Sequence, residues 1–137
     1  MTSYHYLICS KYAHIYNYEG GGVSFNSGVS CKLIGGDRGL FNVEDVVKSI
    51  NPPDFYHSPK TSLVCIENTT NKGGGACWDI EELKKIKKIC DENNLFFHMD
   101  GARIWNAFVK NKINFKEYGN LFDTISVCLS KGLGCWF

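Results

Sequence analysis

The chain has 137 residues, of which 44% are hydrophobic and 14% aromatic, so it is long enough to bury one core and is not a disordered tail. Its 15 basic and 14 acidic side chains leave a net charge of +1, which excludes the strongly basic surface that binds nucleic acid or an anionic membrane. Small molecules and other protein chains remain as the expected partners.

Strands and helices alternate along the first half of the chain. Apolar runs predict strands at 5–10, 29–35 and 62–68. A helix is expected at 42–50, between the second and third of these strands, because its valines and isoleucine recur at helical spacing. Asn42 is placed to cap this helix at its start.

The second half continues the alternation. The clearest helix is expected at 79–93, where Asp79 and Glu82 resemble a capping box. A strand at 95–99, a helix at 102–110 and a strand at 125–129 follow. The last strand is expected to be buried, because Ile125, Val127 and Leu129 line its interior.

Repeated β-α-β units with almost continuously apolar strands predict an α/β fold, in which helices flank a mainly parallel sheet. In such sheets, ligands bind beyond the carboxyl ends of the strands. Two predicted strands are followed there by an ionisable residue and then a glycine, at Asp100 and at Lys131. The glycines allow the sharp turn and the close backbone approach that a site needs.

A carboxylate and an amine at one sheet edge suit pyridoxal phosphate. The lysine forms a Schiff base with the cofactor aldehyde, and the aspartate keeps the pyridine nitrogen protonated so that the ring accepts electrons. Each residue also has an ordinary explanation, since Lys131 can be a surface lysine and the Asp100–Gly101 pair a turn. Their combination favours the cofactor site.

Other features of the sequence give weaker signals. The glycine-rich segments 19–23 and 71–76 lack the Lys-Ser/Thr pair or the GxGxxG spacing of nucleotide sites, so we interpret them as flexible loops. The seven cysteines form no CxxC pair, which favours small buried residues in a reducing compartment over a zinc site or disulfides. With no membrane span or signal peptide expected, a cytoplasmic location follows.

Two long segments carry a family resemblance. Residues 67–107, which include HMDGARIWNA, and residues 122–134, FDTISVCLSKGLG, closely resemble threonine aldolases of the β-eliminating lyase group, within the fold-type I pyridoxal-phosphate enzymes. HIYNYEGGG and GGDRGLFNVEDV are similar to family segments in the same order. The resemblance implies that residues 1–137 are an incomplete cofactor-binding large domain, without the family's N-terminal segment and C-terminal small domain, and inactive alone.

The resemblance also implies roles for individual residues. Lys131 matches the catalytic lysine that carries the cofactor, and Asp100 matches the aspartate at the pyridine nitrogen. Arg103 matches the arginine near the cofactor that binds the substrate carboxylate. His14 matches the histidine that stacks on the cofactor ring, and it is also a candidate acid or base.

Three further positions are less certain in role. Alternate residues of a strand point to the same face, so His98 is expected on the same face as Asp100. We therefore expect His98 to contact and orient Asp100 rather than to act as a catalyst. The motif does not fix a role for Glu19. Thr70 stands where many family members have a histidine that contacts the substrate hydroxyl, which leaves the base and the threo or allo preference open.

The function implied by the resemblance is cleavage of threonine or allo-threonine to glycine and acetaldehyde with pyridoxal phosphate, in a homodimer or homotetramer of full-length chains. No metal is implied. Two alternatives stay open: another amino-acid lyase of the same group, and a catalytically inactive fragment that only associates with other chains.

Overall fold

Residues 5–135 are described in the structure, a computed structural model, and they form a five-stranded sheet in the order β2-β1-β3-β4-β5. All four pairs of neighbouring strands are parallel. The strands are β1 (His5–Ser10), β2 (Ser30–Ile34), β3 (Lys60–Glu67), β4 (Phe96–Gly101) and β5 (Thr124–Val127). The predicted α/β fold with a mainly parallel sheet is confirmed.

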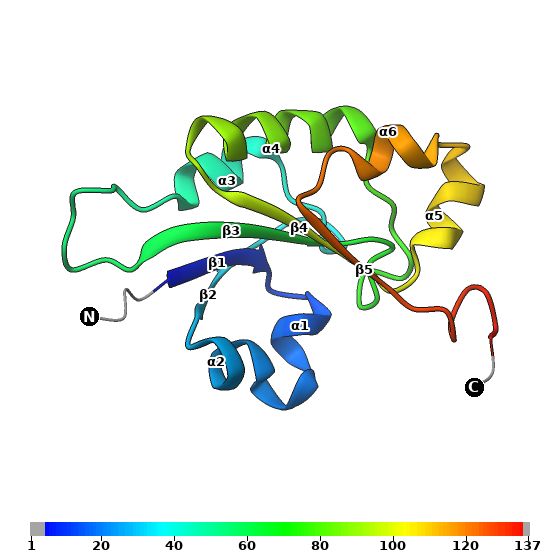
Figure 1. Ribbon diagram of the computed structural model, residues 1–137, viewed down its shortest axis with the longest axis horizontal. Coiled ribbons are helices and arrows are strands. Elements are labelled where there is room, and N and C mark those ends of the chain that lie inside the picture. The colour runs from blue at the N-terminus through cyan, green and yellow to red at the C-terminus, as the bar shows by residue number, and fades with distance from the viewer. Residues whose placement is uncertain (1–4, 136–137) are drawn as a thin grey trace.

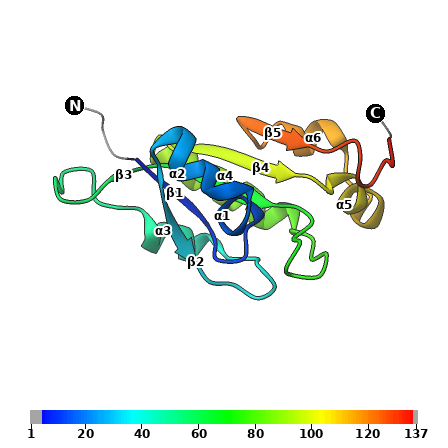
Figure 2. The same cartoon turned by 90° about the horizontal axis from the view of Figure 1, so that it is seen from below.

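Helices cover the two faces of the sheet unequally (Figure 1). The face called here the upper face is covered by α3 (Val43–Ser49), α4 (Ile80–Glu92), α5 (Ile104–Asn111) and α6 (Phe115–Gly119). The lower face is covered only in part, by α1 (His14–Asn17), the short 3-10 helix η1 (Glu19–Gly21) and α2 (Gly22–Ser27). Figure 2, seen from below, shows α1 and α2 in front of the strands. No described helix is long and apolar enough to cross a membrane.

The starts of α3 and α4 show how the sequence sets the helix ends. Asn42 caps α3 as predicted, because its Oδ1 accepts from the Asp45 N–H at 2.9 Å and the Asp45 carboxylate accepts from the Asn42 N–H at 3.1 Å. Asp79 caps α4 through the Glu81 N–H. The expected capping box between Asp79 and Glu82 is wrong, since Glu82 Oε1 accepts instead from the Val43 N–H, 2.7 Å away, an unpaired donor at the start of α3.

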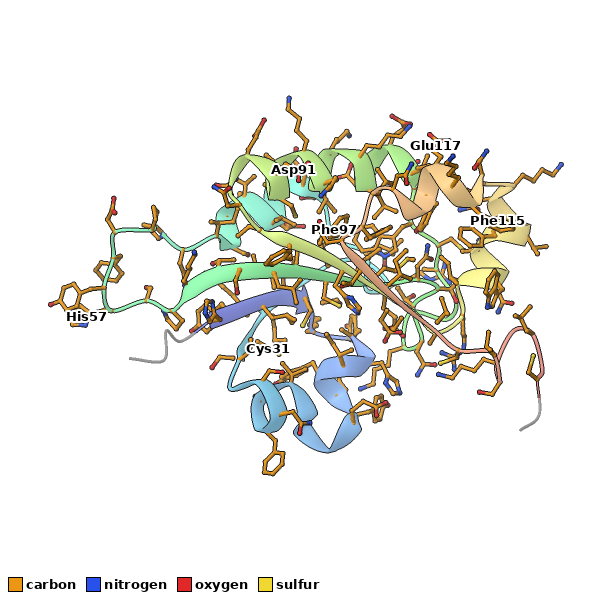
Figure 3. The ribbon with its side chains drawn as sticks, viewed as in Figure 1. Cys31, His57, Asp91, Phe97, Phe115 and Glu117 are labelled. Atoms are coloured by element: carbon orange, nitrogen blue, oxygen red, sulfur yellow. The ribbon has the colours of Figure 1, made fainter. Side chains whose placement is uncertain are left out.

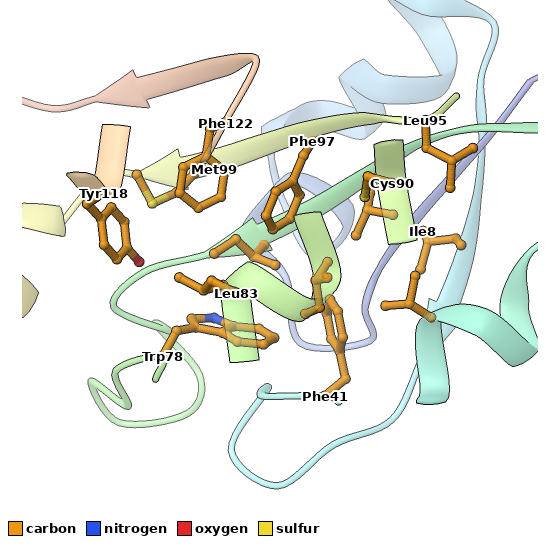
Figure 4. Close-up of a cluster of buried hydrophobic side chains, with 14 of the residues drawn as sticks. Ile8, Phe41, Trp78, Leu83, Cys90, Leu95, Phe97, Met99, Tyr118 and Phe122 are labelled. Atoms are coloured by element: carbon orange, nitrogen blue, oxygen red, sulfur yellow. The ribbon is translucent and has the colours of Figure 1, made fainter. Parts of the chain in front are cut away.

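The main core lies between the upper face and the helices above it (Figure 4). Helix α4 contributes Leu83, Ile86 and Cys90, all fully buried, and this burial raises the pKa of the Cys90 thiol to about 12. Figure 3 shows Phe97 of β4 in this layer and Cys31 on the side of α2. A smaller cluster on the lower face contains Leu7, Cys9, Ala13 and Cys65.

The structure differs from the expectations for the last strand, for segment 19–23 and for some of the cysteines. The last strand is not buried: Ile125 is 37% and Val127 48% exposed, because β5 is an edge strand that pairs only with β4. Segment 19–23 is not an open loop: Glu19, Gly20 and Gly21 form a tight turn with left-handed φ values of 57°, 60° and 73°, and α2 begins at Gly22. Three of the seven free cysteines are buried as expected, namely Cys9, Cys65 and Cys90, whereas the others are partly or fully exposed.

Candidate cofactor site at the carboxyl edge of the sheet

Asp100 is the central acidic residue of the candidate site. It is the penultimate residue of β4 and pairs directly with Glu67 of β3, and its side chain is buried. Asp100 Oδ1 accepts a hydrogen bond from the Ala102 N–H at 3.1 Å, and its backbone carbonyl accepts from the Asn68 N–H at 2.9 Å. The turn after β4 therefore fixes the carboxylate at the carboxyl edge of the sheet.

Glu67, which ends β3, is a buried acid that the sequence analysis missed. Its Oε1 accepts from the Asn71 N–H at 2.9 Å. Burial raises the pKa of Glu67, and the negative charge of Asp100 acts in the same direction, while the Asn71 and His14 N–H groups oppose the shift. Glu67 could have been found by the pattern that identified Asp100, an acidic residue at the end of a strand. It was missed because the predicted strand extended to residue 68 and so placed Glu67 inside the strand.

His14 starts α1 and is half-buried, just beyond the end of β1. Its Nδ1 lies 3.1 Å from Glu19 Oε1, and its ring centroid lies 4.6 Å from that of Tyr18. Because the His14 backbone N–H faces the Glu67 carboxylate, which itself neighbours Asp100, the structure brings these residues together at one edge.

Lys131 follows the end of β5, which runs parallel to β4, so it lies at the same edge of the sheet as Asp100. Its side chain is exposed. The loop that carries it folds back on itself, with the Gly134 N–H bonded to the Lys131 carbonyl at 3.1 Å. At Gly132 a Cβ would lie 3.0 Å from Asn106 Oδ1, so this loop packs against the first turn of α5.

Arg103 occupies the N-cap position of α5, three residues beyond Asp100, and is half-buried. Its guanidinium makes no hydrogen bond or ion pair with any residue in the described range 5–135. The planar group is therefore available for a ligand carboxylate near the carboxyl edge.

Thr70 lies in the loop after β3 and is buried. Its hydroxyl has no hydrogen-bond partner within residues 5–135, and it lies 2.2 Å from the position that a Cβ on Gly73 would take. Arg38 clamps the same loop, because its Nε and Nη2 donate to the carbonyls of Gly73 and Gly74 at 2.7 and 2.8 Å. Thr70 therefore places a short side chain against Gly73 of its own loop.

His98 lies within β4, two residues before Asp100 and so further from the carboxyl edge of the sheet. Its Nδ1 is 2.7 Å from Thr124 Oγ1 on β5, and burial lowers the pKa of the imidazole, while the Asp100 charge acts in the opposite direction. His98 also lines a cavity of about 600 Å³ on the lower face, formed by the amino-terminal halves of the strands together with α2. Neither Asp100 nor Lys131 lines this cavity, so it is distinct from the candidate site.

Comparison with known proteins identifies the family. The sequence pattern of the Beta-eliminating lyase family matches residues 1–136. The chain belongs to the β-eliminating lyase family. Low-specificity L-threonine aldolases of Eremothecium gossypii and Saccharomyces cerevisiae are 38% and 37% identical to it over 130 residues, which is 93% of this chain and 33% of each relative. This β-eliminating lyase chain thus spans about a third of the length of the curated relatives it matches, and the predicted resemblance is confirmed.

The solved structure of a threonine aldolase from Leishmania major has the same fold. Its TM-score to this β-eliminating lyase chain is 0.81 at 24% identity, and the match covers 93% of this chain and 37% of that one. The β-eliminating lyase family uses pyridoxal phosphate.

The residues at the carboxyl edge fit this cofactor in two respects. The Ala102 N–H donates to Asp100 Oδ1, so the second carboxylate oxygen, Oδ2, can accept a hydrogen bond from a protonated ring nitrogen. Lys131 is exposed and lies in the loop that follows β5, the strand beside β4. Within residues 5–135, no three histidine, cysteine or acidic side chains are grouped as a metal site would need.

Proposed function

We propose that this chain supplies the cofactor-binding part of a pyridoxal-phosphate-dependent threonine aldolase, which cleaves threonine or allo-threonine to glycine and acetaldehyde. One observation carries the proposal: the buried Asp100 stands at the end of β4, and Lys131 lies in the loop that follows the neighbouring parallel strand β5, beyond the same edge of the sheet. The identity of 37–38% to two low-specificity L-threonine aldolases supports the choice of substrate.

Three residues of the chain have separate roles in cofactor and substrate binding at the carboxyl edge of the sheet. Pyridoxal phosphate, when bound, supplies an electron sink for the pair of electrons of the bond that breaks. Lys131 holds the cofactor through its amine. Asp100 accepts a hydrogen bond from the protonated ring nitrogen, and its negative charge favours that protonated form. Arg103 binds the substrate α-carboxylate and so orients the bond to be cleaved.

A proton must also leave the substrate β-hydroxyl. A threonine hydroxyl is a poor proton acceptor near neutral pH, and that of Thr70 lies against Gly73 of its own loop. His14 has an imidazole at the carboxyl edge, in a position that lies next to Glu67. We therefore assign the proton transfer to His14, and the full-length protein is proposed to work as a homodimer or homotetramer.

The test is chemical labelling of Lys131. A full-length chain that contains these residues is incubated with pyridoxal phosphate, reduced with borohydride and mapped by peptide mass analysis, with Lys131→Ala as the control. We expect the pyridoxyl group on Lys131 at cofactor concentrations that leave the other lysines unmodified. Equal labelling of Lys131 and exposed lysines such as Lys88 would overturn the assignment.

Substrate choice has its own test. A second lyase activity of the same group, on an aromatic amino acid, would release no glycine from threonine. Glycine formed from threonine by a full-length chain that contains these residues supports the aldolase. Its absence, together with turnover of an aromatic amino acid, would favour the other lyase.

Association with other chains is a second candidate function, and one observation favours it. The lower face is only partly covered, so Phe96 is 66% exposed beside the cavity there. Sedimentation of the purified chain, with and without pyridoxal phosphate, distinguishes association from the aldolase function. A stable oligomer that binds no pyridoxal phosphate would favour association alone.

A further inference from the structure

Glu19 has an unusual backbone conformation for a residue with a side chain. Its φ is 57°, in the left-handed region, and Gly20 and Gly21 follow with φ of 60° and 73°. Glycine adopts this region freely, whereas a residue with a Cβ is strained there. A strained residue persists only where the surrounding structure holds it, and such residues are frequent at functional sites.

The contact that this conformation makes is with His14. Glu19 Oε1 lies 3.1 Å from His14 Nδ1, across the kink that separates α1 from α2. Since a carboxylate oxygen accepts hydrogen bonds, the Nδ1 of a neutral His14 must carry the proton. The other ring nitrogen, Nε2, then has its lone pair free, and it makes no hydrogen bond with residues 5–135.

Other groups around the imidazole do not offer this contact. The Glu67 carboxylate at the end of β3 faces the His14 backbone N–H, and the Tyr18 ring lies tilted at 36° to the imidazole. Glu19 is therefore the acceptor that selects between the two ring nitrogens.

We propose that Glu19 is a positioning residue that holds His14 with its proton on Nδ1, so that Nε2 is the nitrogen that takes the substrate hydroxyl proton. The proton transfer rests on the proposed aldolase function, whereas the state of the imidazole is a property of this chain alone. Because the Glu19 side chain is 65% exposed, its charge is largely screened, and the short contact between Oε1 and Nδ1 rather than the long-range charge sets the effect.

The experiment reads the imidazole nitrogens directly. The ¹⁵N-labelled chain is studied by long-range ¹H–¹⁵N NMR, well above the pH at which histidine is ordinarily charged, and His14→Asn assigns the His14 signals. We expect His14 in one state, with Nδ1 protonated. A protonated Nε2 on His14 would overturn the proposal.

Two variants at position 19 separate the hydrogen bond from the backbone. Glu19→Gly removes the carboxylate and suits the left-handed conformation, so the fold is kept and His14 should become a mixture of both neutral forms. Glu19→Gln retains an acceptor oxygen and should keep the proton on Nδ1. Glu44→Gln, at an exposed glutamate of α3, is the matched control and should leave the His14 signals unchanged. An unchanged His14 in Glu19→Gly would contradict the proposal.

Kinetics of a full-length active chain add a separate readout. Glu19→Gly should lower kcat for threonine about tenfold or more with little change in KM, because proton transfer and not substrate binding is affected. A changed KM at unchanged kcat would overturn the role of Glu19 in proton transfer. If instead no aldolase activity exists at all, the proposed function fails, while the NMR result still decides the state of His14.

Discussion

Glu67 and Asp100 lie directly opposite each other at the carboxyl ends of β3 and β4, and both carboxyl groups are buried. Two negative charges placed side by side away from water repel each other, and burial makes each more costly. The pKa of Glu67 is accordingly raised, first by burial and further by Asp100. The raised pKa of Glu67 therefore has two physical causes at this edge, the burial of its carboxyl group and the negative charge of Asp100 beside it.

The first prediction is that Glu67 makes stability fall as pH rises. A carboxyl whose pKa is higher in the folded than in the unfolded chain binds its proton more tightly when folded. Its stabilising contribution is thus complete below the ordinary value of 4.5 and is lost as pH rises through the folded pKa. The free energy of unfolding of the wild type minus that of Glu67→Gln should fall over this range, measured by urea denaturation.

Glu44→Gln, at an exposed glutamate of α3, is the control for that series and should show no comparable slope. A difference between wild type and Glu67→Gln that rises with pH would mean that Glu67 is held ionised by the Asn71 and His14 N–H groups.

The sequence predicted most of the sheet and the upper helices because apolar periodicity reports the side that is buried. Strand β1 was predicted at its observed bounds, and α3 with its observed cap. The short helices α1, α2 and α6 were missed, since four to six residues hold too little periodicity to identify them.

The candidate site was predictable only where a motif marked it. Asp100 and Lys131 stand beside glycines at strand ends, and this pattern is visible in the sequence. Glu67 depends on the register between β3 and β4, and the clamp of Arg38 on the loop at Gly73 joins segments 35 residues apart. Such contacts follow from tertiary packing, which local sequence does not encode.

The second prediction concerns a buried hydrogen bond below α6. Asn68 Nδ2 donates to the hydroxyl of Tyr118, and both residues are fully buried. Tyr118→Phe leaves the amide without a partner in the core, which should cost about 1–3 kcal/mol of unfolding free energy. Tyr56→Phe, at a tyrosine that is 87% exposed, should cost less than about 0.5 kcal/mol in the same urea denaturation. Equal effects would show that the Asn68 amide finds another partner.

The third prediction tests the clamp on the loop after β3. Arg38→Lys replaces a fork that bonds two carbonyls by a single ammonium, so the loop should open more often. Hydrogen exchange should become faster at the amides of Thr70 and Gly75, whose bonds close this loop. The amides of β1 serve as the internal control and should be unchanged. Unaltered exchange at Thr70 would mean that the loop holds without Arg38.

The fourth prediction concerns Arg103 in a full-length active chain. If its guanidinium binds the substrate carboxylate through two hydrogen bonds, Arg103→Lys leaves a point charge and should raise KM for threonine about tenfold or more. Lys110→Ala, on the exposed side of α5, should leave KM unchanged. An unchanged KM in Arg103→Lys would make the arginine structural.

The last prediction compares two glycines with opposite surroundings. A Cβ on Gly73 would lie 1.9 Å from the Arg38 carbonyl oxygen, and because that atom belongs to the backbone, the two loops must separate. Gly73→Ala should therefore destabilise the chain by about 3 kcal/mol or more and release the Arg38 clamp. A Cβ on Gly119, at the end of α6, meets no atom within 4 Å.

Gly119→Ala should consequently raise the free energy of unfolding by about 0.5–1 kcal/mol, because alanine loses less chain entropy in a helix than glycine does. Urea denaturation of both variants gives the comparison, and hydrogen exchange at the Gly75 amide tells where Gly73→Ala acts. Faster exchange there, together with an unchanged core, places the damage in the loop that carries Thr70. A tolerated Gly73→Ala would mean that the loops at Arg38 and Gly73 are not packed backbone against backbone, and the Arg38 clamp would then have no role in holding the edge of the site.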